Sequence, residues 1–326
     1  MKKILITGSS GFIGQSLVES LFKLNKPVRG ALRSTKSFSP NSQIEYVSIG
    51  DISLKTNWEN ALVGIDCVIH CAGETHRINK IRTDDLKIYQ SVNVDGTKQL
   101  AEQAAKAGVK RLIFLSSIKV IGENSDNRYN NISLNNQKKY SFTFNNVPNP
   151  ENYHSVSKFE AEKILWEISV TTGLEVVVVR LPLVYGYGVK GNLMRLMKLI
   201  NSGIPLPFSL IDNKRSFIGI DNLVDLLICC IDHPKAKGKT FLASDGKDLS
   251  TPELIKLIAS SMGRKARLFP LPLFMLKFLG SIFGKQKEIN RLIGSLNVNI
   301  DYTKETLNWT PSVNVKEGIR RMVQGK

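Results

Sequence analysis

The amino-acid sequence predicts an α/β protein with a doubly wound parallel sheet and a smaller C-terminal lobe. Short apolar runs alternate with helical patterns up to about residue 181. These runs are apolar without interruption, which is typical of parallel strands that helices cover on both faces. After residue 181 the pattern is less regular, and proline-marked turns with a return strand indicate a smaller lobe interwoven with the first domain.

The elements are expected in a regular order along the chain. The expected strands are residues 2–8, 27–34, 44–51, 67–73, 111–117, 174–186 and, in the second half, 239–244. The expected helices of the first domain are residues 11–25, 92–109 and 153–173. The polar, Asn-rich residues 124–150 are expected to form a loop or hairpin inserted before the last of these helices. The predicted domains are 1–180 and 181–326, with later segments around 214–244 completing the sheet.

The chain has 326 residues and a net charge of +17. The favoured interpretation is a basic surface that aids solubility, and the alternative is attraction to an anionic partner. Among anionic partners a small phosphate-bearing ligand fits best, because no run of Arg and Lys alternates with aromatics as in a nucleic-acid groove. The four cysteines form no CxxC motif, and two lie in apolar runs. Buried, reduced thiols and a cytoplasmic location are therefore expected.

Two apolar stretches raise the question of a membrane. The first begins "MKKILITGSSGFIG", breaks into Gly and Ser and lacks a cleavage site, so we expect it to remain in the mature protein. The second, residues 268–284, contains prolines and Lys277 and is shorter than the roughly 18 residues of a spanning helix. We expect it to be a helix that packs on the core or lines a pocket, with docking on a membrane surface as the alternative.

The motif "ITGSSGFIG" places Gly8, Gly11 and Gly14 directly after a strand and at the start of a helix. Glycines allow a tight turn and a close approach of the backbone to a pyrophosphate, and a helix N-terminus offers N–H groups to it. The strand, turn and helix are all expected here, so the motif predicts a Rossmann-type dinucleotide site.

The end of the second strand bears on the choice between NAD and NADP. Leu32 is followed by Arg33 and Ser34, where a carboxylate would otherwise hold the ribose 2′-hydroxyl. A guanidinium there accommodates a 2′-phosphate, so NADP(H) is favoured and NAD(H) is the alternative. Asp51, at the end of the third strand, is expected either to accept a hydrogen bond from the adenine amino group or to be a helix N-cap.

Eight motifs in this order resemble the extended short-chain dehydrogenase/reductase family, also called the NAD-dependent epimerase/dehydratase family. They are "TGSSGFIG" (7–14), "GDI" (50–52), "HCAG" (70–73), "VNVDGT" (92–97), "LSSIKVIGE" (115–123), "SVSKFEAE" (155–162), "RLPLVYGYG" (180–188) and "RSFIGIDNLVD" (215–225). Within the family, the chain looks most like UDP-glucose 4-epimerase-like proteins and UDP-N-acetylquinovosamine-forming 4-ketoreductases. The family's 4,6-dehydratases carry Thr-Asp-Glu where this chain has Ser117-Ile118-Lys119, which argues against dehydration.

The resemblance implies a set of binding residues. For the cofactor they are Gly8, Ser10, Gly11, Phe12, Ile13, Gly14, Arg33, Ser34, Asp51, Ile52, Cys71, Ala72, Gly73, Asn93, Lys158 and Leu181. For the UDP-sugar they are Thr75, Lys119, Asn192, Leu193, Arg215 and Arg291, with His76 as a polar lining residue and Tyr185 shaping the pocket near the nicotinamide. No metal is expected, since the sequence shows no cluster of ligands with metal spacing. A homodimer through helices near 84–107 and 153–172 is implied as well.

The resemblance also implies a catalytic serine, tyrosine and lysine. Ser117 and Lys158 match the first and last, but His154 occupies the tyrosine position, four residues before Lys158. Three hypotheses follow: His154 transfers the proton; Tyr153 does so from an irregular helix start; or the position is impaired and the protein only binds its ligands.

The predicted function is an NAD(P)-dependent reaction at C4 of a UDP-sugar. The first choice is reduction of a UDP-4-keto-6-deoxy-N-acetylhexosamine in surface-polysaccharide synthesis, because Arg33 favours NADPH. The alternatives are a UDP-glucose or UDP-N-acetylglucosamine 4-epimerase, and a non-catalytic protein that binds NADP(H) and a sugar nucleotide.

Overall fold

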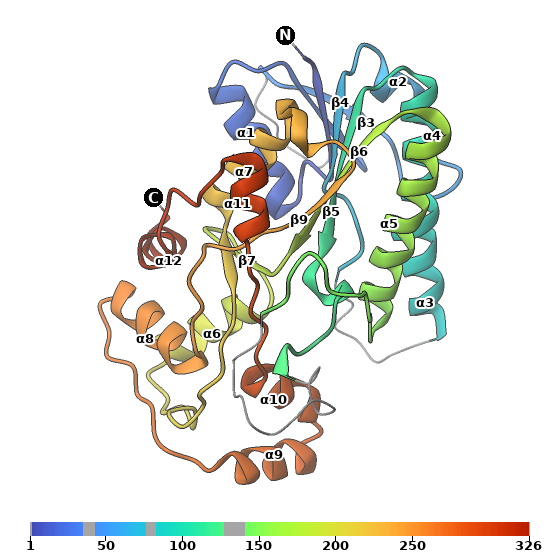
Figure 1. Cartoon of the computed structure of the whole chain (residues 1–326). Coiled ribbons are helices and arrows are strands. Elements are labelled where there is room, and N and C mark those ends of the chain that lie inside the picture. Colours follow the sequence, from blue (N-terminus) through green and yellow to red (C-terminus); the bar gives the residue numbers. More distant parts are fainter. Residues whose placement is uncertain (1, 35–42, 76–82, 127–140, 326) are drawn as a thin grey trace.

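A seven-stranded parallel sheet organises the protein. The structure is a computed structural model, which describes residues 2–34, 43–75, 83–126 and 141–325. The strand order is β3-β2-β1-β4-β5-β6-β9, which reverses direction between β1 and β4 (Figure 1). The predicted doubly wound α/β class is confirmed. The strands are β1 (Ile4–Thr7), β2 (Val28–Leu32), β3 (Glu45–Ser48), β4 (Cys67–His70), β5 (Arg111–Ser117), β6 (Glu175–Leu181) and β9 (Lys239–Leu242).

Helices cover both faces of this sheet, as Figure 1 shows. One face carries α1 (Phe12–Lys23), α7 (Ile220–Asp232) and α11 (Asp301–Leu307), and the other carries α2 (Glu59–Leu62), α3 (Thr83–Tyr89), α4 (Gly96–Lys106) and α5 (Tyr153–Thr172). Side chains alternate along each strand. In β1, Ile4 and Ile6 join the core beneath α1 and α7, whereas Leu5 joins the core beneath α4 and α5. This two-sided burial explains the uninterrupted apolar runs of the sequence.

The helix expected at 92–109 begins differently from a regular α-helix. Residues Gln90–Asp95 form a π-helical turn, and α4 continues from Gly96. A Cβ atom on Gly96 would lie 2.2 Å from Cγ2 of Ile52, so a glycine is required for this approach of the helix to the loop after β3. Single π-turns of this kind are frequent at functional sites.

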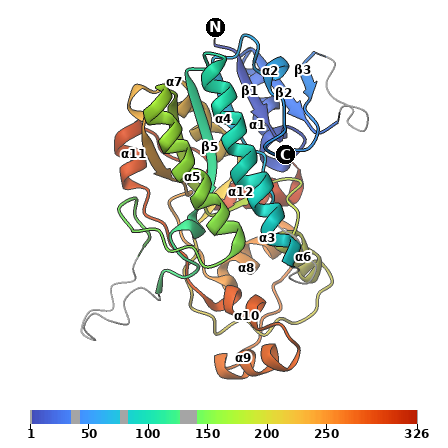
Figure 2. The same ribbon diagram turned by 90° about the vertical axis from the view of Figure 1, so that its right-hand side faces the viewer.

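The C-terminal lobe lies beyond the carboxyl ends of the sheet strands in both views (Figures 1 and 2). Its elements are the parallel pair β7 (Leu183–Tyr185) and β8 (Phe217–Gly219) with helices α6 (Asn192–Asn201), α8 (Thr251–Ser261), α9 (Leu273–Ile282), α10 (Gln286–Ile293) and α12 (Val315–Gln324). Two 3₁₀ turns, Ile118–Val120 and Pro234–Ala236, complete the described secondary structure. The lobe has its own core, which includes Tyr185, Ile258 and Ile319.

The expected packing of residues 268–284 on the core is wrong. In α9 only Leu276 and Gly280 are buried, while Phe274 and Phe278 are 72% and 65% exposed. An apolar run alone does not show whether its helix packs against the core or faces outward, because a buried helix face and an exposed apolar face contain the same residue types. Of the predicted insert 124–150, residues 127–140 lie outside the described part, and Phe142 forms a parallel bridge with Val298.

The four cysteines are free thiols. Cys67 and Cys230 are buried, whereas Cys71 and Cys229 are half-buried. Burial raises the pKa of both Cys67 and Cys71 to about 12, so these groups are neutral at pH 7. Among the described residues, no helix has both the length and the apolar character that crossing a membrane requires.

Candidate active site

The turn from β1 into α1 is built from glycines for steric reasons. Gly8 has φ +65°, and a Cβ atom there would lie 2.9 Å from Cα of Ala72. A Cβ atom on Gly14 would lie 2.2 Å from the carbonyl oxygen of Gly8. The first turn of α1, described in full, contains no acidic side chain. The turn therefore presents open backbone and a positive helix end, which fit a pyrophosphate.

The side chains within this turn face solvent, the sheet core or the lobe core. Ser10 is exposed and Ile13 is half-buried against the sheet core. Phe12, also half-buried, packs against the core of the C-terminal lobe. The glycine turn thus links the sheet to the lobe through Phe12.

Arg33 and Asp51 form an ion pair at the end of β2 and β3. Nε of Arg33 lies 2.9 Å from Oδ1 of Asp51, and both side chains are more than 80% exposed. The N-cap alternative for Asp51 is wrong, because α2 begins at Glu59 with Trp58 as its N-cap. Ser34 follows in an exposed position.

The loop after β4 is fastened to helix α5 by the buried side chain of Asn93. Its Oδ1 accepts a hydrogen bond from the N–H of Glu74 at 2.8 Å, and its Nδ2 donates to the Glu74 carbonyl at 3.1 Å. Nδ2 also donates to Oγ of Ser157 at 2.9 Å. Cys71, Ala72 and Gly73 belong to this fastened loop.

Lys158 is 5% exposed and lies against the same loop. A Cβ atom on Gly73 would come within 3.1 Å of its Nζ, so a larger residue here would require the lysine to shift by a few tenths of an ångström. Nζ donates to the Leu115 carbonyl at 2.9 Å and lies 4.5 Å from the centre of the Phe114 ring. Burial lowers the pKa of Lys158 to about 8, and the negative charge of Glu162 opposes this shift.

Ser117 and His154 come from β5 and α5. Ser117 ends β5, pairs in register with Leu181 of β6, and accepts the N–H of Lys119 at 3.2 Å. His154 is half-buried, with its ring centre 6.2 Å from that of Tyr89 in an edge-on arrangement.

Tyr153 is the first residue of α5 and is 44% exposed. The side chain of Asn152 accepts the N–H of Ser155 at 3.0 Å, and Oγ of Ser155 accepts the N–H of Asn152. This capping box gives α5 a regular start. The irregular start that Tyr153 would need in order to turn toward Lys158 is therefore not present.

Three cations and one carboxylate lie close together beyond the end of β5. Nζ of Lys119 lies 2.7 Å from Oε2 of Glu123, and Nδ2 of Asn152 donates to Oε1 of Glu123. Nη1 of Arg215 donates to the carbonyl of Arg291 at 2.8 Å. Burial, followed by the charges of Arg291 and Arg215, lowers the pKa of Lys119, and Glu123 opposes the shift. We call Lys119, Arg215 and Arg291 the cation cluster.

The remaining predicted substrate residues lie on other elements. Asn192 is exposed at the start of α6, and Leu193 is buried in the core of the lobe. Thr75 is exposed and ends a described segment. His76 lies outside the described residues. The described residues include no group of three His, Cys, Asp or Glu side chains placed to hold a metal ion.

Sequence reasoning missed several residues that organise this region. Glu123 and Asn152 were not predicted, although the four-residue separation of Glu123 from Lys119 is a signal for an ion pair. Tyr185, predicted to shape the pocket, donates to Oδ2 of Asp245 at 2.6 Å within the lobe. Burial, then the charge of Asp245, raises the pKa of Tyr185, so its hydroxyl stays protonated.

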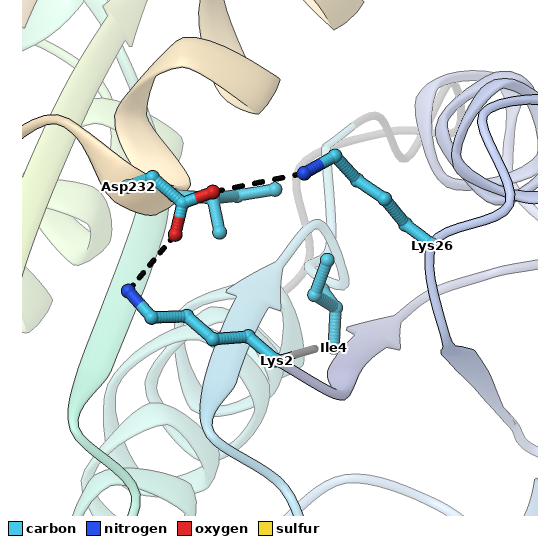
Figure 3. Close-up of a pocket in the computed structure, with 5 residues that line it drawn as sticks. Lys2, Ile4, Lys26 and Asp232 are labelled. Atoms are coloured by element: carbon cyan, nitrogen blue, oxygen red, sulfur yellow. Dashed lines mark ion pairs between the residues drawn. The ribbon is translucent and has the colours of Figure 1, made fainter.

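A separate pocket of about 200 Å³ is lined by Lys2, Ile4, Lys26, Ile231 and Asp232 (Figure 3). It adjoins the start of β1, away from the carboxyl ends of the strands. Asp232 binds Lys2 at 2.9 Å and Lys26 at 3.6 Å. Asp232 thus offsets one of the two lysine charges, and its ion pairs join α7 to the N-terminal segment, at a place separate from the candidate active site.

The chain is similar in sequence to proteins of a known family. The model of the NAD dependent epimerase/dehydratase family matches residues 4–243. A UDP-glucose 4-epimerase of Vibrio cholerae is 41% identical over 327 residues, covering 99% of this chain and 95% of that protein. An N-acetyl-alpha-D-glucosaminyl-diphospho-ditrans,octacis-undecaprenol 4-epimerase of Escherichia coli O157:H7 is 27% identical and covers 88% of this chain and 82% of that protein.

Solved structures share the fold at lower identity. UDP-glucuronic acid 4-epimerase from Bacillus cereus in complex with NAD has a TM-score of 0.77 and 21% identity, covering 98% of this chain and 95% of that one. UDP-glucose 4-epimerase from Thermotoga maritima with UDP-glucose has a TM-score of 0.75 and 21% identity, covering 99% and 97%.

Proposed function

Because the chain belongs to the NAD dependent epimerase/dehydratase family, we propose that it transfers a hydride at C4 of a UDP-sugar. The observation that carries the proposal is the position of the cation cluster. Lys119 lies in the 3₁₀ turn directly after Ser117, so the cluster adjoins the end of β5, where Lys158 contacts the Leu115 carbonyl. A diphosphate held by guanidinium groups would keep the attached sugar beside these residues.

The dinucleotide is assigned to the glycine turn and the fastened loop. Gly8, Gly11 and Gly14 would hold the pyrophosphate, and Asp51 with Ile52 would flank the adenine. The bound nicotinamide would supply the hydride exchange at the sugar carbon. Arg33 supports NADP(H), because its exposed guanidinium can turn from Asp51 to a 2′-phosphate. NAD(H) is the alternative, supported by the NAD-bound structures of similar fold.

The chain's own residues would act on the C4 oxygen. Ser117 donates a hydrogen bond to it, and His154 takes or gives its proton. Lys158 holds the nicotinamide ribose and places a positive charge beside the proton path. The exposed Tyr153 has no part in this assignment.

Our first candidate reaction is the reduction of a UDP-4-keto-6-deoxy-N-acetylhexosamine, because Arg33 favours the reducing cofactor NADPH. The second is 4-epimerisation, which the full-length similarity to the Vibrio cholerae UDP-glucose 4-epimerase supports. Purification separates them. An epimerase is expected to retain NAD, which denaturation releases and absorbance detects, and to interconvert UDP-sugars without added cofactor. A reductase is expected to oxidise added NADPH only when a keto-sugar is present.

The role of His154 is tested by the variant His154→Tyr. If His154 transfers the proton, the original chain turns over its substrate and the pH profile of kcat differs between the two proteins. If the position is impaired, the variant is about 100-fold faster or more, in line with the usual contribution of a general acid or base. The control Tyr153→Phe should not change kcat in the original chain or in His154→Tyr, because the Tyr153 hydroxyl is assigned no role. A protein that binds cofactor but shows no turnover as either variant would contradict the enzymatic proposal.

A homodimer through α4 and α5 is also proposed. These helices pack on each other and run side by side along one side of the molecule (Figure 2). Light scattering during gel filtration measures the mass directly, and a monomer at micromolar concentration would contradict the dimer.

A further inference from the structure

Helix α9 and the residue after it carry a continuous apolar face that the described structure leaves uncovered. We define the α9 face as Leu273, Phe274, Met275, Phe278, Leu279, Ile282 and Phe283, which are 41–72% exposed. Large exposed apolar patches mark interaction sites, because exposing them to water is unfavourable. In both views α9 lies at the far end of the C-terminal lobe from the N-terminus (Figures 1 and 2).

The helix is oriented by its two buried residues. A Cβ atom on Gly280 would lie 2.8 Å from Cγ1 of Ile289, so α9 packs closely on α10 through its glycine side. Leu276, one turn before Gly280, is buried on the same side. Phe274, Phe278 and Ile282 recur every four residues and therefore share the opposite side. The apolar face thus points away from the protein.

The surroundings of the α9 face are strongly basic. Between residues 264 and 291 the chain has seven cationic residues and one acidic residue, Glu288. The cationic residues are Arg264, Lys265, Arg267, Lys277, Lys285, Lys287 and Arg291. Apolar and aromatic side chains with a Lys/Arg fringe are the pattern of helices that lie in the interface of anionic membranes.

We propose that the α9 face docks on the surface of an anionic phospholipid membrane. Its apolar side chains enter the boundary between headgroups and acyl chains, and the flanking lysines and arginines contact lipid phosphates. A second copy of the chain is a poorer occupant. A ten-residue helix is about 15 Å long and about 10 Å wide, so it offers far less than the about 800 Å² per partner of a stable interface, and two such basic surfaces would repel each other.

The docking places one part of the candidate active site at the membrane. Arg291 lies on α10, which packs directly beneath α9. Substrate and product would therefore enter and leave beside the lipid surface. The docking itself does not depend on which reaction the site catalyses.

Flotation of the full-length protein with vesicles tests the proposal. The protein is expected to float with vesicles of phosphatidylethanolamine and phosphatidylglycerol, less so as salt rises, and not with pure phosphatidylcholine. The variant Phe274→Ser/Phe278→Ser is expected to lower the partition coefficient at least about tenfold, since two rings no longer enter the lipid. Lys285→Gln/Lys287→Gln should weaken binding and reduce its salt dependence.

The matched control is Leu24→Ser/Val63→Ser, which changes two side chains of 55% and 65% exposure outside the α9 face and the proposed dimer helices. It should float like the original chain. Circular dichroism and nicotinamide-nucleotide binding verify the fold of each variant. Three results would overturn the proposal: no flotation of the original chain, equal flotation of the Phe variant, or self-association that the Phe variant abolishes while vesicles remain unbound.

Discussion

At the scale of single residues, Lys158 shows how burial sets chemistry. The amine donates a hydrogen bond to the Leu115 carbonyl and lies 4.5 Å from the centre of the Phe114 ring, and the side chain is 5% exposed. Its charged form is therefore destabilised, and its pKa falls from 10.5 to about 8. At pH 7 the lysine is still protonated, so a buried positive charge lies at the candidate active site and lowers the stability of the folded protein.

This cost predicts that the free energies of unfolding of the original chain and of Lys158→Met differ by an amount that depends on pH. Between pH about 8 and 10.5 the unfolded lysine binds a proton that the folded one has released, so the original chain gains stability as pH rises. Below pH 8 the penalty is largest, about 3 kcal/mol at most. The methionine variant should thus be more stable at pH 7.5, and the difference should shrink by pH 10.

Urea unfolding at both pH values measures this difference. Lys163→Met is the control, because its amine on the same helix is 47% exposed and pairs with Glu160. A difference between original chain and Lys158→Met that is constant with pH would contradict the lowered pKa.

A second residue-scale prediction concerns Arg33. Removing it in Arg33→Ala should weaken NADPH binding about 10- to 100-fold, the usual value of a charge-assisted hydrogen bond to phosphate. NADH binding should change little, because the partner of Arg33 in the structure is Asp51. Fluorescence titration gives the ratio of the dissociation constants for NADPH and NADH. The variant Lys23→Ala, which removes an exposed cation elsewhere, is the control. An unchanged ratio would mean that Arg33 does not read the 2′-phosphate.

At the scale of elements, α5 is joined to the sheet by a buried ion pair. Arg180 of β6 donates to both carboxylate oxygens of Glu162 at 3.0 and 2.6 Å, and Ser116 of β5 donates to the same carboxylate at 2.5 Å. Both charged residues are almost fully buried. The helix that carries His154 and Lys158 is therefore held in register by groups one turn beyond Lys158.

Removing one partner should be costly. Glu162→Gln leaves the Arg180 charge buried without its counter-charge and is expected to lower the free energy of unfolding by about 3–5 kcal/mol. The matched control Glu160→Gln breaks an exposed pair on the same helix and should change it by less than about 1 kcal/mol. Thermal or urea unfolding measures both. Equal effects of the two variants would show that burial does not strengthen this contact.

The elements also show what the sequence could and could not predict. Strands such as β6 were predictable, because a strand covered on both faces must be apolar at every position, as Val176–Val179 are. The glycine turn was predictable from the spacing of Gly8, Gly11 and Gly14. The direction of α9 and the contact of Arg215 with the carbonyl of Arg291 were not, because both depend on how separate segments pack against each other, which residue spacing does not reveal.

At the scale of the whole molecule, the net charge of +17 acts on every encounter with an anionic substrate. Long-range attraction raises the association rate and is screened by salt. We therefore expect kcat/KM for a UDP-sugar to fall as KCl rises from low to physiological concentration, with a much smaller change in kcat. Sucrose of equal osmolality is the control for non-ionic effects. A kcat/KM that is independent of salt would show that the basic surface does not steer the substrate.

The connection of the sheet to the lobe has a consequence for how the protein folds. The edge strand β9 pairs with β6, yet the segment that leads to it has already passed through the lobe strand β8 and the sheet-covering helix α7. A chain stopped at residue 180 would lack β9, α7 and α11, leaving β6 as an open edge and one face of the sheet covered by α1 alone. The sheet cannot complete its core until the chain has passed through the lobe, so the two parts are expected to unfold in one cooperative transition.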